Sequence, residues 1–167
     1  MSNLTRVFMK RLRPATNDDL ADILSWLTTA ESLKLWGGPL LTFPPDVAKT
    51  WCEIGANDNN SFVLVDQQDR VLGFGQTLQR EAHAIHLARI ILAPDTRGQG
   101  LGRVLCEQLM QTAIKQHQPA KITLNVYQEN EVAVSLYRSL GFVLADHHSM
   151  QGAYAMEFVC GAGLIAR

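Results

Sequence analysis

The chain has 167 residues, of which 47% are hydrophobic and 19% are charged. These values are typical of a globular protein with a sizeable apolar core. The formal net charge of -1 argues against nucleic acid or an anionic membrane surface as a partner. No apolar run reaches the roughly 18 residues of a membrane span, and Lys10, Arg11 and Arg13 interrupt the apolar core that a signal peptide needs. We therefore expect a single cytoplasmic domain spanning residues 1–167.

Apolar periodicity and breaker residues divide the chain into strands and helices. The predicted strands are Val7–Arg13, Ser61–Asp66, Val71–Gln79, Ala84–Ala93, Lys121–Tyr127, Phe142–Ala145 and Ala153–Val159. The predicted helices run from Thr16 to Thr28, from Asp46 to Ala56, from the glycine-rich stretch to His117 and from Asn130 to Leu140. This order predicts one mixed α/β domain, with about seven strands and about four helices.

Residues 30–45 are harder to assign. They contain the breakers Trp36-Gly37-Gly38-Pro39 and Pro44-Pro45, yet they are too apolar for a solvated linker. We expect a loop or short helix folded over a pocket, and the alternative is a covered edge of the core. Trp36 could wall a substrate pocket, although an aromatic side chain in an apolar loop more often packs into the core.

Metal-ligating patterns are weak in this chain. Cys52, Cys106 and Cys160 are scattered without metal-ligand spacing and fit a reducing compartment. His147 and His148 are adjacent, but no third ligand follows at a suitable spacing, so a solvated turn is the better interpretation. We predict no metal site.

The most informative stretch is Ala93–Arg103, which follows a buried strand pattern and precedes a long amphipathic helix pattern. Its three glycines, Gly98, Gly100 and Gly102, allow the backbone to approach a bulky ligand. The first turn of the following helix offers unpaired N–H groups and the positive end of the helix dipole. These features predict a phosphate or pyrophosphate site. A P-loop is disfavoured, because no Lys-Ser/Thr pair follows Gly102.

Two motifs make the sequence resemble the GNAT superfamily of acyl-CoA-dependent N-acetyltransferases. Arg97-Gly98-Gln99-Gly100-Leu101-Gly102 is similar to the family's Arg/Gln-x-x-Gly-x-Gly/Ala loop. After a strand, the segment from Asn130 to Phe142 is similar to its Asn-x-x-Ala-x-x-Leu-Tyr-x-x-x-Gly-Phe motif. The match is strongest from His86 to Phe142 and rests mainly on element order from Val7 to Asn60. The resemblance implies the GNAT fold, with two central strands that splay apart at a bulge.

The resemblance also implies where acetyl-CoA, the co-substrate, would bind. The backbone of the strand end would pair with the pantetheine arm, and a backbone N–H of Ile91 or Leu92 would stabilise the developing oxyanion. The loop would bind the pyrophosphate, and Asn130 would contact CoA or merely cap its helix. The implied binding residues are Ile90, Ile91, Leu92, Arg97, Gly98, Gln99, Gly100, Leu101, Gly102, Arg103, Asn130 and Tyr137.

Two proton transfers need residues as well. Tyr137 aligns with the family tyrosine that protonates the departing thiolate, and its alternative role is that of a core-edge tyrosine. The ribosomal-protein N-terminal branch has a glutamate where this chain has Asn125, which cannot act as a base but lies in the substrate region. His86 falls at the glutamate position of the histone branch, and an ordinary histidine pKa of about 6.5 suits a general base. Glu81, His83 and ordered water are the other candidates for the base.

The sequence therefore predicts acetyl transfer to a primary amine of a small molecule or peptide, by direct attack in a ternary complex. A protein N-terminal or lysine acetyltransferase and a non-catalytic CoA-binding regulatory module are the alternatives. The acceptor itself carries no recognisable motif. The resemblance also allows a homodimer.

Overall fold

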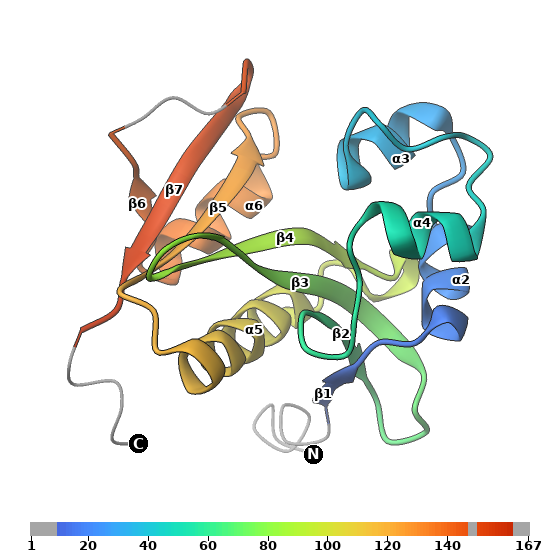
Figure 1. Ribbon diagram of the computed structural model, residues 1–167, viewed down its shortest axis with the longest axis horizontal. Helices are drawn as coiled ribbons and strands as arrows, with labels where there is room; N and C mark the ends of the chain where they lie inside the picture. Colours follow the sequence, from blue (N-terminus) through green and yellow to red (C-terminus); the bar gives the residue numbers. More distant parts are fainter. Residues whose placement is uncertain (1–9, 147–149, 162–167) are drawn as a thin grey trace. The chain divides into compact units, whose positions relative to one another are not determined.

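The computed structural model describes residues 10–146 and 150–161 (Figure 1). The predicted turn at His147 and His148 lies outside these residues. Within the described ranges, seven strands are hydrogen-bonded in the order β1-β2-β3-β4-β5-β7-β6, which confirms the mixed α/β class. The chain divides into two compact units, Met1–Gln76 with Arg89–Leu105 and Thr77–Ala88 with Cys106–Arg167. Strands β3 (Val71–Glu81) and β4 (Ala84–Leu92) contribute residues to both units.

The first unit holds an antiparallel arrangement of strands and three short helices. Strand β2 pairs with β1 on one side and with β3 on the other. Its elements outside the shared strands are β1 (Arg11–Pro14), α2 (Asn17–Ser25), α3 (Ala30–Gly37), α4 (Val47–Glu53), β2 (Ser61–Val65) and the 3-10 turn η1 (Pro94–Thr96). Helix α2 lies against α4 (Figure 1). All five residues of β2 are buried, and Val63 and Val65 belong to the apolar core of this unit.

Helix starts in this unit follow from short polar side chains. Thr16 accepts a hydrogen bond from the Asp19 N–H at 3.3 Å, while the Asp19 carboxylate accepts one from the Thr16 N–H at 2.8 Å. This capping box confirms the predicted start of α2. Thr29 and Ser32 form an equivalent box, which starts α3 inside the stretch for which the sequence left open a loop or a short helix.

The second unit is built around strand β5 (Lys121–Tyr127), which has the bounds that the sequence predicted. It pairs in parallel with β4 and antiparallel with β7 (Ala153–Val159), and β7 pairs with the short β6 (Val143–Leu144). Helix α6 (Glu131–Ser139) contacts β5. Helix α5 (Leu101–His117) begins in the first unit and contributes the buried Leu109 and Ala113 to the second.

The parallel ladder between β4 and β5 is short. It covers four residue pairs, from Ala84–Lys121 to Leu87–Leu124, although β4 continues to Leu92. Two residues after the ladder ends, Arg89 has a φ of 53°, in the left-handed region. A residue in this conformation interrupts an extended strand as a bulge does. The pairing of β4 with β5 therefore ends close to an irregularity in β4, and the resemblance to the GNAT family implied central strands that part at a bulge.

Among the described residues, no helix combines the length and the apolar character needed to cross a membrane.

Candidate acyl-transfer site

The glycine-rich loop lies between η1 and α5, as the sequence predicted. Gly98 and Gly100 have φ values of 76° and 78°, which residues with a Cβ adopt only with strain. A Cβ built on either glycine would meet no atom within 4 Å, so both face open space. Helix α5, of 17 residues, starts at Leu101 directly behind them. The loop thus has an open backbone, in a conformation that glycine adopts without strain, at the positive end of a long helix, which is a suitable cradle for a phosphate group.

Side-chain hydrogen bonds tie the loop and η1 to the backbone that precedes them. Arg97 donates from Nη2 to the carbonyl of Leu92 at 3.3 Å, and Gln99 donates from Nε2 to the carbonyl of Asp95 at 3.3 Å. Thr96 is buried and donates from Oγ1 to the carbonyl of Ala93 at 2.8 Å. These contacts hold the loop in shape.

The end of β4 supplies backbone groups next to this loop. Ala93 donates its N–H to the carbonyl of Leu72 on β3 at 2.8 Å. Backbone groups of an extended strand alternate between its two edges, so Leu92 and Ile90 point their N–H groups away from β3. The guanidinium of Arg97 on the Leu92 carbonyl agrees with this direction. Of the two N–H groups that the sequence offered as oxyanion donors, that of Leu92 therefore points away from β3 and that of Ile91 points toward it.

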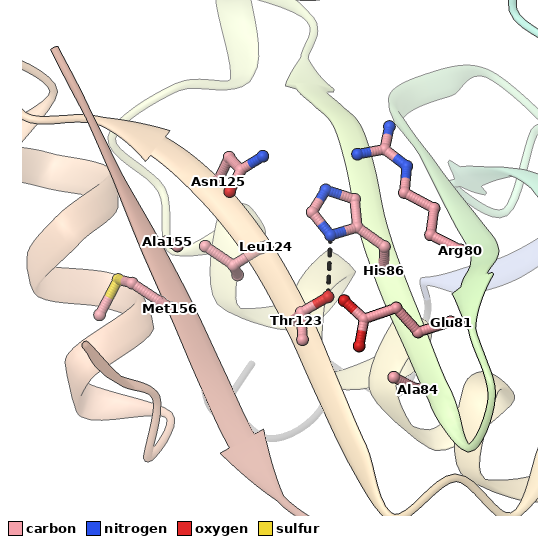
Figure 2. Close-up of a pocket in the computed structure, with 9 residues that line it drawn as sticks. All are labelled: Arg80, Glu81, Ala84, His86, Thr123, Leu124, Asn125, Ala155 and Met156. Atoms are coloured by element: carbon pink, nitrogen blue, oxygen red, sulfur yellow. Dashed lines mark hydrogen bonds between the residues drawn. The ribbon is translucent and has the colours of Figure 1, made fainter. Parts of the chain in front are cut away.

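A pocket lies in the second unit on the strands β3, β4, β5 and β7 (Figure 2). Its volume is about 140 Å³, and it is lined by Arg80, Glu81, Ala84, His86, Thr123, Leu124, Asn125, Ala155 and Met156. His86 and Thr123 are partners in the parallel ladder, and His86 Nδ1 lies 2.8 Å from Thr123 Oγ1. This hydrogen bond fixes the imidazole ring. Asn125 and Glu81, which the sequence singled out, line the same pocket, whereas His83 lies in the turn before β4 with a φ of 60° and is not part of the lining.

Tyr137 lies on α6 and is 7% exposed. Its ring contacts Phe142 edge-on, with ring centroids 6.0 Å apart. Burial raises the pKa of its phenol well above the ordinary value, and the nearby Cys106 thiol raises it further. The phenol therefore stays protonated at neutral pH. Asn130 caps this helix, because its Oδ1 accepts a hydrogen bond from the Ala133 N–H at 3.2 Å.

Trp36 packs into the core of the first unit. Its ring centroid lies 5.8 Å from that of Phe74, and its indole N–H donates to the carbonyl of Arg89 at 2.9 Å. These are the contacts of an aromatic side chain that packs into the core, which is the second of the two roles given above for Trp36.

Sequence reasoning missed two polar residues of the pocket, Arg80 and Thr123. Thr123 could have been found by pairing β4 with β5 in register, but the sequence does not state that register. Arg80 gave no signal at all, because an isolated charged residue near the end of a strand resembles any solvated side chain.

Comparison with known proteins identifies the family to which this fold and this loop belong. Residues 20–142 match the acetyltransferase (GNAT) family. The chain belongs to this family, which confirms the resemblance stated above.

Several curated proteins are similar to part of the chain. A peptidyl-lysine N-acetyltransferase of Escherichia coli (strain K12) is 35% identical over 81 residues, 48% of each chain. A spermidine N(1)-acetyltransferase of Vibrio cholerae is 33% identical over 94 residues, 54% of this chain and 53% of the relative. The chain thus spans about half the length of the curated relatives that it matches.

Solved structures match over most of the chain. The crystal structure of a spermidine N-acetyltransferase from Vibrio cholerae in complex with CoA and spermine has a TM-score of 0.75 at 21% identity. The match covers 91% of this chain and 96% of that one. At this level of identity the likeness shows a common fold.

Proposed function

We propose that the protein transfers the acetyl group of acetyl-CoA to a primary amine, by direct attack within a ternary complex. The observation that carries the proposal is the open cradle in front of Gly98 and Gly100 at the head of α5. A Cβ at either position would fill the space that a pyrophosphate needs. Family membership over residues 20–142 supports the same conclusion. We further propose that residues 1–167 act as one acetyltransferase domain.

Residues of the first unit would bind the co-substrate. The N–H groups from Gly98 to Arg103 would hold the pyrophosphate. The backbone of Ile90 and Leu92 would pair with the amides of the pantetheine arm. The Leu92 N–H would stabilise the negative charge that develops on the thioester oxygen.

Residues of the second unit would move the two protons. His86 would take a proton from the ammonium group of the acceptor, directly or through water, so that the free amine can attack the thioester carbonyl. As the carbon–sulfur bond breaks, Tyr137 would donate its proton to the departing thiolate. The phenolate would then regain a proton, because burial raises the pKa of Tyr137 and so favours its neutral form. Asn130 would contact CoA in addition to capping α6.

The relatives suggest two acceptor classes, lysine side chains and polyamines. A peptidyl-lysine acetyltransferase is the second candidate function, and it is favoured by the 35% identity to such a protein over 81 residues. We also propose a cytoplasmic location and allow for a homodimer.

Thiol release tests the proposal. The protein is incubated with acetyl-CoA and a panel of small amines and lysine peptides, and free CoA is followed with a chromogenic thiol reagent. Amine-dependent release at a rate that scales with protein concentration is expected. Tight binding of acetyl-CoA by calorimetry with no release for any amine would instead identify a CoA-binding module without turnover.

A further inference from the structure

We infer that the pocket of the second unit selects a small amine that also carries a carboxylate, such as an amino acid, and that Arg80 binds this carboxylate. The inference rests on the proposed function, because it names the acceptor of that reaction. Its evidence lies in the charges that line the pocket, all of which come from one compact unit.

Arg80 supplies a cation for which the described residues offer no counterion. The ion pairs near this pocket join Lys121 to Glu81 at 3.9 Å and to Glu157 at 3.5 Å. Neither carboxylate pairs with Arg80 within 4.0 Å. Arg80 lies near the exposed end of β3, and its guanidinium extends beside the His86 ring (Figure 2). A planar guanidinium with free donors is the group that proteins use to bind carboxylates in a bidentate manner.

Glu81 does not turn the pocket into a cation site. It is the only acid among the nine lining residues, and its side chain is 60% exposed. It also faces the ammonium group of Lys121, which reduces its field toward a ligand. A polyamine would bring several positive charges to a pocket that already holds Arg80, and like charges at short distance repel. The charges therefore favour an acceptor with one amine and one anionic group.

The remaining lining residues suit a short ligand. Thr123 and Asn125 offer a hydroxyl and an amide, while Ala84 and Ala155 leave space above the strands. The volume of about 140 Å³ is close to that of a protein cavity that holds a benzene-sized molecule. A small amino acid has about as many heavy atoms as benzene. Since the Arg80 guanidinium and the His86 imidazole face the same space (Figure 2), one short molecule could place its carboxylate on the first and its amine near the second.

The test compares acceptors that differ only in the carboxylate. Amino acids, their carboxamides and spermidine are offered with acetyl-CoA, and kcat/KM is measured by thiol release. We expect at least one amino acid to exceed its carboxamide by roughly 10- to 100-fold, the usual strength of a hydrogen bond to a charged group. Arg80→Gln should bring the ratio of the two kcat/KM values close to one and leave the affinity for acetyl-CoA unchanged. Lys115→Gln, which removes the same charge from an exposed position on α5, should leave the ratio as in the wild type.

Two results would overturn the inference. If carboxamides or spermidine are acetylated as well as any amino acid, and Arg80→Gln does not change this, acetyl transfer stands but the carboxylate site does not exist. If no amine is acetylated, the binding of amino acids to the CoA-bound protein is measured by calorimetry, which does not require turnover. Binding that Arg80→Gln weakens at least about tenfold would uphold the site, and absence of binding would reject it together with the proposed reaction.

Discussion

Replacing Gly100 by glutamate tests the pyrophosphate cradle most directly. Gly100 has a φ of 78°, and nothing lies within 4 Å of the position of a Cβ. An L-residue in this conformation costs about 1–2 kcal/mol in stability. No steric clash adds to this cost, so Gly100→Ala and Gly100→Glu should both fold.

The effect on acetyl-CoA binding should be much larger than the effect on folding. Each charge-assisted hydrogen bond between a main-chain N–H and a phosphate contributes about 1.5–3 kcal/mol. A carboxylate in the cradle would displace the pyrophosphate from about two such bonds, about 3–6 kcal/mol in total. Since 1.4 kcal/mol corresponds to a factor of ten, Kd should rise at least about 100-fold.

A matched control separates strain from binding. Gly152 has a φ of 80°, and a Cβ there would also meet nothing within 4 Å. Gly152→Glu should therefore lose about the same stability by thermal unfolding and keep the wild-type affinity in calorimetry. Unchanged affinity of Gly100→Glu for acetyl-CoA, or an equal loss in Gly152→Glu, would refute the assignment of the loop as the pyrophosphate site.

The other predictions concern protons. Tyr137→Phe keeps the contact with Phe142 but removes the acid, so kcat should fall by about 100-fold or more while KM stays close to that of the wild type; wild-type turnover would exclude the acid role. His86→Ala should remove the acidic limb of the kcat/KM profile, and an unchanged profile would assign the base to water or Glu81. Burial alone would raise the pKa of Asp19, but hydrogen bonds from Arg13 and Thr16 outweigh it and hold the pKa below its ordinary value. Asp19→Asn should therefore cost about 2 kcal/mol of unfolding free energy at pH 7. That contribution is present above the unfolded pKa of about 3.9 and is lost as pH falls through the lower folded pKa, so the two proteins should converge in acid denaturation.

Local signals in the sequence determined most of the elements. Strands Lys121–Tyr127 and Ala153–Val159 have the bounds that their alternation predicted. Thr16, Asp46 and Asn130 cap the helices that they were expected to start, because a short polar side chain satisfies a free N–H wherever the chain turns into a helix. The glycine-rich loop was also determined locally, since its strand-before and helix-after context lies within about thirty residues.

Tertiary structure decided what depends on partners distant in the sequence. Helix α3 lies among breakers, and buried Leu33 and the contacts of Trp36 hold it in the core in spite of them. The His86–Thr123 hydrogen bond joins residues 37 apart, and Arg80 reaches the same pocket from a third strand. The alternation of apolar and polar residues tells which face of a strand is buried, but it does not tell which residue of a neighbouring strand lies opposite. That choice is made by the packing of the whole sheet, so the pocket and its charges became visible only in the fold.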